Sequence, residues 1–357
     1  MAAGIPKKTR GRGTSSTVDA RYLEFNRTAV DDGWFIEGDG NFPQTTVSVE
    51  RPRTIITRNQ SPDIPFEQSI NPYRGCEHGC IYCYARPTHA YLDLSPGIDF
   101  ETKLFVKDNA DELLTRELSR PGYRCSAIAM GTNTDPYQPV ERDRKITRRI
   151  IEVLSRCNHP LTIVTKSRLI ERDIDLLAPM AARGLAMVSI TITTLDNELA
   201  RRLEPRAGSP HRRLDTIRSL HDAGIPVGVM FAPVIPALND TEMESVLEAS
   251  TQAGAEAAGY IMLKLPHEIK SLFKEWLLLH EPLKADHIMS LVRDIRQGRE
   301  NDPNFFSRQR GRGVFADMIR KRFELQCKQL GLNRIHRRLD TGKFVPPRRQ
   351  TDQMDLF

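Results

Sequence analysis

Short apolar runs alternate with amphipathic stretches from about residue 66 to residue 263. Five of the runs have strand length, which predicts strands at 126–130, 161–165, 185–192, 226–231 and 258–263, and a sixth strand is expected at 66–70. Apolar positions recur at helical spacing between them, near 144–157, 170–182 and 241–253 and in two stretches that end at residue 221. Strands that alternate with helices favour parallel βαβ units with right-handed crossovers.

The pattern changes at both ends of this region. The first sixty residues have no sustained apolar period, so we expect a mostly irregular N-terminal extension over 1–60 and a core over 61–265. A purely helical pattern follows, near 268–280, 285–297 and 314–330, which predicts a helical C-terminal cap over 266–335. Residues 336–357 are basic and contain Pro346 and Pro347, which predicts a flexible tail.

Three cysteines follow the first predicted strand. Cys76, Cys80 and Cys83 have the spacing C-x3-C-x2-C, with Tyr82 directly before the last cysteine. An iron–sulfur cube is normally closed by four cysteines, so three thiolates would leave one iron open for a small molecule. The spacing therefore predicts a cluster that activates a bound molecule.

The pattern C-x3-C-x-aromatic-C resembles the signature of the radical S-adenosylmethionine (SAM) superfamily. This resemblance implies a [4Fe-4S] cluster whose open iron binds SAM, and Tyr82 against the adenine. One electron, from a donor such as flavodoxin or ferredoxin, would cleave the sulfonium to give a 5′-deoxyadenosyl radical. The implied fold is a partial TIM barrel, (β/α)6, which matches the six predicted strands and collects its chemistry at their carboxyl ends.

A narrower resemblance is to the spore photoproduct lyase branch of DNA-repair-like radical enzymes. Residues 76–84, 165–166 and 203–210 and Ser189 carry it. It implies that Lys166 and Ser189 hold the carboxylate and ribose region of SAM and that Tyr82 and Tyr84 form a hydrogen-atom relay. Glu204 and Arg206 would lie near the barrel mouth as an ion pair or cofactor contact.

The segment after the second predicted strand differs from the family pattern. Many members carry a Gly-Gly-Glu-like run there, whereas this chain has four other cofactor-binding candidates: Thr132, Asn133, Thr134 and Asp135. Ordinary turn chemistry explains such a cluster equally well. Thr132 also stands where the lyase has a hydrogen-donating cysteine, and its O–H bond is too strong for that role. Cys125 lies seven residues earlier, near the opposite end of the same predicted strand, and is a poor substitute for that cysteine. The resemblance therefore supports the cofactor chemistry better than the substrate.

A zinc site is the main alternative for the cysteines, with His78, His89 or Cys125 as the fourth ligand. The absence of a second cysteine knuckle argues against it. The N-terminus, residues 1–12, is polar and basic without an apolar signal segment, and no stretch has the length of a membrane helix. We therefore expect a cytoplasmic protein with no membrane partner.

Positive charge is concentrated at both ends. Residues 308–349 carry thirteen Lys and Arg against three acids, and residues 1–17 carry four without an acid, which leaves −8 for the rest of a chain of net charge +6. Basic termini favour DNA or RNA as a partner, although a charged surface that is merely solvated by water is the common alternative explanation. The last five residues, Gln353 to Phe357, resemble the peptide that docks on the bacterial sliding clamp.

Three functions fit these observations. The first is a radical enzyme that acts on a nucleic-acid base, as a repair lyase does. The second is radical modification of a peptide or small molecule. The third is a metal-binding nucleic-acid module without catalysis.

Overall fold

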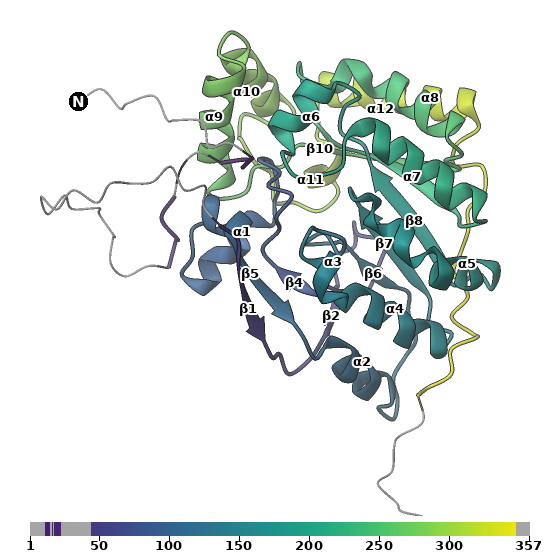
Figure 1. Cartoon of the computed structure of the whole chain (residues 1–357). Coiled ribbons are helices and arrows are strands. Elements are labelled where there is room, and N and C mark those ends of the chain that lie inside the picture. Colours follow the sequence, from purple (N-terminus) through teal and green to yellow (C-terminus); the bar gives the residue numbers. More distant parts are fainter. Residues whose placement is uncertain (1–10, 15, 17, 23–43, 348–357) are drawn as a thin grey trace, which may run out of the picture.

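The computed structural model describes residues 11–14, 16, 18–22 and 44–347. Its main sheet has seven strands in the order β10-β9-β8-β7-β6-β3-β2 (Figure 1). Strands β3 and β6 to β10 are parallel and pair in chain order, and β2 pairs antiparallel with β3. The strands are β2 (Ile56–Arg58), β3 (Gln68–Ile70), β6 (Ile128–Met130), β7 (Leu161–Thr165), β8 (Ala186–Thr191), β9 (Val227–Val234) and β10 (Ala257–Met262). The six expected strands and the (β/α)6 partial barrel are thus confirmed.

Helices cover the outer face of this sheet (Figure 1). They include α4 (Ile146–Arg156), α5 (Ile174–Ala182), α7 (Pro210–Asp222) and α8 (Met243–Gln252), with η2 (Arg168–Asp173), α6 (Asn197–Leu203), η3 (Asp240–Glu242) and α3 (Glu141–Arg144) at the connections. Alternate residues of each strand, such as Ile163, Val188 and Val229, are buried in the core against these helices. The two-residue period of a strand sends the intervening side chains to the inner face.

The inner face of the barrel is lined by small side chains at one level. Strand pairing places Val164, Ser189, Gly228 and Ala257 side by side across β7 to β10. Val164, Ser189 and Ala257 are only half-buried. None of the four has a large side chain at this level of the inner wall.

A smaller sheet is formed by three strands that all come before β6 in the sequence. Strand β1 (Thr46–Glu50) pairs parallel with β5 (Lys103–Lys107), and β5 pairs antiparallel with β4 (Tyr73–Arg74). Helices η1 (Arg86–Leu92), α1 (Ile98–Thr102) and α2 (Ala110–Leu118) belong to the same region. Two short strands, β1 and β2, lie within the range 1–60 for which a mostly irregular extension is expected. Each is too short for its alternation to stand out from a polar sequence.

The C-terminal helices lie beside the β10 edge of the sheet (Figure 1). They are α9 (Ile269–His280), α10 (Ala285–Asp294), α11 (Ser307–Arg310) and α12 (Val314–Leu330), and α12 packs along α8. The Asn333 side chain donates to Ala258 O at 3.0 Å and accepts from Ala258 N at 2.9 Å. Backbone groups of the edge strand are satisfied in this way, which protects an edge that would otherwise pair with another chain.

The first part of the tail expected over 336–357 contacts the barrel. Residues 340–347, here named the C-terminal strap, cross the end of the barrel where the strands begin. Asp340 N donates to Gly184 O and Val345 N to Cys157 O, both at 2.9 Å. The Phe344 ring lies 5.4 Å from Tyr123 and 5.2 Å from His159. Residues 348–357, with the clamp-like peptide, lie outside the described residues.

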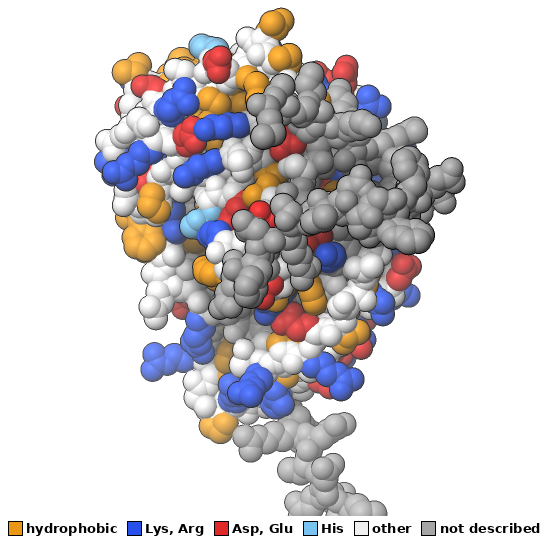
Figure 2. All heavy atoms as spheres, turned by 90° about the vertical axis from the view of Figure 1, so that its left-hand side faces the viewer, with side chains coloured by type: hydrophobic (Ala, Val, Ile, Leu, Met, Phe, Trp, Pro, Cys, Tyr) orange, Lys and Arg blue, Asp and Glu red, His pale blue; other side chains and the backbone are white. Residues whose placement is uncertain are grey.

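The surface mixes charges of both signs. On the face in Figure 2, Lys and Arg side chains gather toward the lower end and are interspersed with acids elsewhere. Among the described residues, none of the helices combines the length and the apolar run that crossing a membrane requires.

Candidate active site

The cysteine loop begins directly after β4, at the end of the barrel where β3 ends. Cys76 N donates to Phe100 O at 2.9 Å, and Cys83 N donates to Cys80 O at 3.2 Å. Cys76 and Cys80 are buried and Cys83 is half-buried. Gly79 has φ +66°, and a Cβ there would lie 2.7 Å from a carboxylate oxygen of Glu101. Only glycine meets both demands at this turn.

Glu101 supports the loop from behind. Its side chain and that of Arg86 are fully buried, and Arg86 Nη2 donates to Glu101 Oε1 at 2.6 Å. Arg86 Nε also donates to Cys80 O at 2.8 Å. The ion pair therefore reaches the backbone of a predicted cluster ligand.

An N-terminal segment also binds the Glu101 carboxylate. Residues 11–14, 16 and 18–22, here named the N-terminal strap, pass over the cysteine loop. Gly13 N donates to Glu101 Oε2 at 3.0 Å and Thr14 N to Glu101 Oε1 at 3.2 Å. A Cβ on Gly13 would lie 1.7 Å from Gly79 O. Neither Glu101 nor this strap was found from the sequence, because both partners are distant along the chain.

A buried carboxylate positions Tyr82. The Tyr82 hydroxyl donates to Glu204, and Thr193 Oγ1 donates to Glu204 Oε1 at 2.6 Å. Arg213 forms a buried ion pair with Glu204 and donates to Thr191 O at 3.0 Å. An ion pair between Glu204 and Arg206, one of the two roles expected for them, is not formed in the structure, because Glu204 pairs with Arg213 and Arg206 with Glu77.

Neighbouring positive charges keep the Glu204 carboxylate ionised. Burial alone would raise the pKa of Glu204, but the positive charges of Arg213 and Lys166, with hydrogen bonds from Thr193 and Tyr82, lower it from 4.5 to about 2. Burial and the Glu204 charge raise the pKa of Tyr82 well above 10.0. The pair is thus an ionised carboxylate and a neutral phenol.

Lys166 follows β7 and approaches Tyr82 from the barrel interior. Its Nζ lies 5.9 Å from the centre of the Tyr82 ring. Burial lowers the pKa of Lys166, but the charges of Cys80 and Glu204 outweigh burial and raise it. Ser189 lies on the inner face of β8, paired with Val164 two residues before Lys166. Both are on the inner wall below the cysteine loop.

Arg206 lies on the outer side of the loop. Its Nη2 is 3.1 Å from Glu77 Oε1, and its backbone N donates to His78 O at 3.3 Å. Arg206 is half-exposed and Glu77 is buried. Arg206 therefore contacts the cysteine loop and not Glu204.

The four candidates after β6 have different surroundings. Asn133 N donates to Asn71 Oδ1 at 3.1 Å, and the buried Thr134 donates to Tyr73 O at 3.0 Å. Asp135 accepts from Thr165 Oγ1 at 2.7 Å and from Lys166 N at 2.9 Å. These are bonds that shape the loops after β6 and β7.

Asp135 also faces the cysteine loop. Its Oδ2 lies 3.4 Å from His78 Nδ1. Burial would raise its pKa, but His78 and the hydrogen bonds from Lys166 and Thr165 lower it to about 2. Thr132 O accepts from the hydroxyl of Tyr84, which is 46% exposed.

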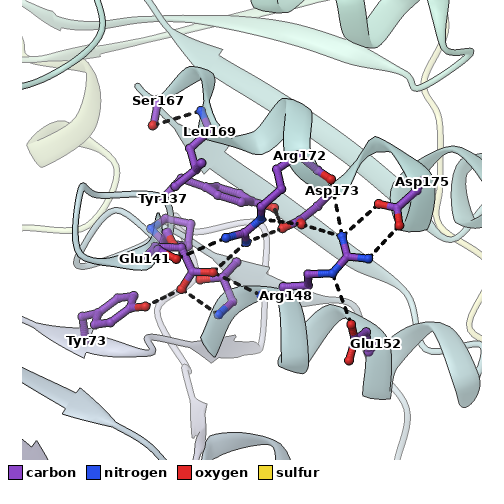
Figure 3. A network of polar contacts seen from close by, with 12 residues as sticks. Tyr73, Tyr137, Glu141, Arg148, Glu152, Ser167, Leu169, Arg172, Asp173 and Asp175 are labelled. Carbon is purple, nitrogen blue, oxygen red and sulfur yellow. Dashed lines mark hydrogen bonds and ion pairs between the residues drawn. The ribbon is translucent and has the colours of Figure 1, made fainter. Parts of the chain in front are cut away.

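A polar network anchors the 131–141 segment from the outside (Figure 3). Buried Glu141 accepts from Arg172 Nη2 at 2.7 Å, and Tyr73 donates to the same carboxylate. Arg172 and Arg148 both bind the buried Asp173, at 2.8 and 2.9 Å. The network joins the end of this segment to η2 and α4, so it holds the loop that carries Asp135.

The thiols fit a cluster better than a single metal ion. Burial raises the pKa of Cys80 to about 12 and that of Cys76 well above 9.0. Free thiolates are therefore disfavoured here unless bound iron supplies positive charge. Within the described ranges, no three His, Cys, Asp or Glu side chains converge on one ion. An iron–sulfur cube does not require three ligands around one ion, because each of its cysteines binds a different iron.

The alternative zinc ligands are engaged or remote. His78 Nδ1 faces Asp135, and His89 Nε2 lies 3.0 Å from Lys103 O. Cys125 precedes β6, at the end of that strand opposite the cysteine loop. Nothing in this geometry favours the zinc interpretation.

Known proteins resemble both the sequence and the fold. The family model of the radical SAM superfamily matches residues 70–249, half of the chain. An uncharacterized protein of Mycobacterium tuberculosis is 38% identical over 232 residues, which cover 64% of this chain and 68% of that protein. An uncharacterized protein of Methanocaldococcus jannaschii is 31% identical over 173 residues, 48% of this chain and 62% of that protein.

Solved structures of spore photoproduct lyase share the fold. One mutant has a TM-score of 0.58 at 16% identity, with 80% of each chain covered. Another, with bound S-adenosylmethionine and dinucleoside spore photoproduct, has a TM-score of 0.55 at the same identity and coverage. The superfamily uses a [4Fe-4S] cluster and S-adenosylmethionine with electrons from a reductant, which confirms the cofactors expected from the cysteines. This chain belongs to the radical SAM superfamily.

Proposed function

We propose that the substrate of this radical SAM enzyme is a base within a nucleic acid. The observation that carries the proposal is one level of the inner wall of the barrel, where the half-buried Val164, Ser189 and Ala257 are small or medium-sized. A flat group can lie against such a wall, as a flipped or single-stranded base would. The lyase structures of similar fold include complexes with a dinucleoside photoproduct, which supports the same substrate class.

Cys76, Cys80 and Cys83 would hold the cluster. Such a cluster, with bound S-adenosylmethionine, would provide the one-electron reductive cleavage of the sulfonium that is expected to give a 5′-deoxyadenosyl radical. Lys166 and Ser189 would bind the carboxylate and ribose region of S-adenosylmethionine, because they lie on the inner wall and Lys166 carries positive charge at the cysteine loop. An electron donor of the flavodoxin or ferredoxin type would serve as the reductant.

Tyr82 and Tyr84 would stand on either side of the reacting space. Glu204 fixes the hydroxyl of Tyr82, whereas Tyr84 is half-exposed and bonded to Thr132 O. We assign Tyr84 to substrate contact or hydrogen transfer and Tyr82 to the adenine. Asp135 would hold the backbone of Lys166, as a positioning residue.

The final hydrogen donor differs from that of the lyase. Thr132 occupies the position of the lyase cysteine, and its hydroxyl lies 3.4 Å from Asn71 Oδ1. The reaction we propose is therefore radical modification of a base in which the last hydrogen comes from another group. This leaves lyase activity on a thymine dimer as a narrower case to be tested.

The C-terminal positive charge is partly used within the chain. Arg308, Arg322 and Arg337 form ion pairs with Asp63, Glu244 and Glu256 of the acidic body. These arginines are less available to phosphates than their number suggests. Nucleic-acid contacts are better placed at the barrel mouth than along the whole C-terminal segment.

The experiment uses anaerobically reconstituted full-length protein, dithionite and deuterated S-adenosylmethionine. We expect about four irons per chain and release of 5′-deoxyadenosine, both abolished by Cys83→Ala. A panel of damaged and undamaged oligonucleotides is then digested to nucleosides and analysed by mass spectrometry. Deuterium or a mass change in a nucleoside supports the proposal. Turnover of S-adenosylmethionine with unlabelled nucleosides, together with label in a peptide, would favour the alternative substrate class.

A further inference from the structure

A basic and aromatic rim lies on the open side of the barrel. It consists of Tyr84, Lys264, Phe305, Phe306 and Arg308. Lys264 follows β10, Tyr84 ends the cysteine loop, and the other three lie at or next to α11, which packs on β10. Three separate segments therefore meet beside the reacting space.

Lys264 is a half-buried cation without an anionic partner in the described part of the chain. Its Nζ lies 4.3 Å from the centre of the Tyr84 ring and 3.4 Å from Gln309 Oε1. No carboxylate of a described residue lies within 4.0 Å of it, whereas Arg308 is held by Asp63 at 2.6 and 2.7 Å. Burial, together with the charges of Arg308 and Arg296, lowers the pKa of Lys264 to about 8, and the charges of Asp63 and Cys83 offset only part of this effect. An anion bound at Lys264 would offset this cost.

Aromatic rings are exposed on the segment that carries Gln309, the residue that Lys264 contacts. Phe305 is 50% exposed and Phe306 is 62% exposed. Phe306 has φ +64°, which is uncommon for a bulky residue, and its N donates to Asp63 Oδ2 at 2.9 Å. Asp63 lies in the connection between β2 and β3, so its contacts join the two edges of the sheet across the open side. The Asp63–Arg308 pair thus fixes the loop that presents both rings.

We propose that this rim binds a single-stranded stretch of the nucleic-acid substrate, with Lys264 on a backbone phosphate and Phe305 and Phe306 stacking the neighbouring bases. This inference rests on the proposed function and adds the path by which the strand reaches the site. Sites that bind single strands combine cations for the backbone with aromatic faces for the bases. Tyr84, with Lys264 on its ring, would lie next to the base that enters the barrel.

The test measures binding of a fluorescein-labelled single-stranded oligonucleotide to reconstituted full-length protein by fluorescence anisotropy at several salt concentrations. Lys264→Met should weaken binding about tenfold and lower the magnitude of the salt slope by about 0.7, the loss of one phosphate contact. Lys264→Arg should restore both. Phe305→Ala with Phe306→Ala should weaken binding about tenfold with an unchanged salt slope, because stacking releases no counterion.

The matched control is Lys328→Met, an exposed lysine near the end of α12. It makes the same change of charge but should leave the isotherm unchanged. If wild-type protein binds and Lys264→Met behaves like Lys328→Met, the rim is overturned and the proposed function stands. If wild-type protein binds no oligonucleotide, single- or double-stranded, the nucleic-acid substrate itself is overturned. Should Lys264→Met fail to fold, the double phenylalanine variant decides between these outcomes.

Discussion

Arg86 and Glu101 form a fully buried ion pair directly behind the cysteine loop, with 2.6 Å between Arg86 Nη2 and Glu101 Oε1. Each partner has further bonds: Arg86 donates to Cys80 O, and Glu101 accepts from Gly13 N and Thr14 N. A buried pair is costly to desolvate, so its net contribution to stability depends on such additional bonds. Here those bonds connect the N-terminal strap to the backbone of a predicted cluster ligand.

Glu101→Ala should therefore destabilise the protein strongly. Loss of one partner leaves the Arg86 charge buried and unpaired, which costs about 3–5 kcal/mol of unfolding free energy. Urea unfolding measures this loss, and iron content after reconstitution should fall with it. The control is Asp175→Ala, which removes an exposed partner of Arg148 and should cost less than about 1 kcal/mol. Equal losses in the two variants would refute a special role for the buried pair.

The stability of the protein should depend on acid pH through Glu204. Its pKa in the folded protein, about 2, is below the ordinary 4.5, so its contribution is present above pH 4.5 and is lost as pH falls toward 2. The shift corresponds to on the order of 3 kcal/mol. Glu204→Gln should be less stable than wild type at pH 7, and the difference should shrink below pH 4.5. Urea unfolding between pH 7 and pH 3 checks this, and a pH-independent difference would contradict it.

Gly13→Ala should displace the N-terminal strap. The added Cβ would lie 1.7 Å from Gly79 O, and backbone there cannot move without disturbing the cysteine loop. We expect faster proteolytic cleavage near residues 11–22 and less iron bound per chain. Gly342→Ala is the control, since its Cβ meets only the Asp340 side chain, at 3.3 Å. Unchanged proteolysis and iron content in Gly13→Ala would show that the strap does not support the loop.

Local patterns explain what the sequence could predict. Cys76, Cys80 and Cys83 lie within eight residues of sequence, and most of the barrel strands are apolar runs that can be recognised one at a time. The partners that hold the site are different, because they are joined by the fold. Glu101 accepts a hydrogen bond from Gly13, 88 residues away in sequence, and Glu204 accepts one from Tyr82, 122 residues away. Glu204 and Arg206 are close in sequence, which suggested an ion pair between them. In the fold, Glu204 pairs with Arg213 instead.

A truncation series should show that the C-terminal strap contributes to stability and that residues 348–357 do not. Deletion of residues 348–357 should leave thermal stability unchanged and remove the clamp-like peptide, whereas deletion of residues 340–357 should lower stability. The longer deletion removes Phe344 from Tyr123 and His159 and the bond from Val345 N to Cys157 O. Phe344 is half-buried, so loss of its packing should cost on the order of 1–2 kcal/mol, which a melting curve can resolve.

The same series tests the clamp hypothesis. Leu356→Ala with Phe357→Ala should abolish binding to a purified bacterial sliding clamp in calorimetry, as the shorter deletion should, because both remove the apolar pair that would enter a surface groove. Arg348→Ala with Arg349→Ala should retain binding. Since the strap crosses the barrel end opposite the cysteine loop, a clamp bound through the tail would leave the mouth accessible to nucleic acid. Clamp affinity that survives loss of Leu356 and Phe357 would show that the resemblance of this peptide is accidental.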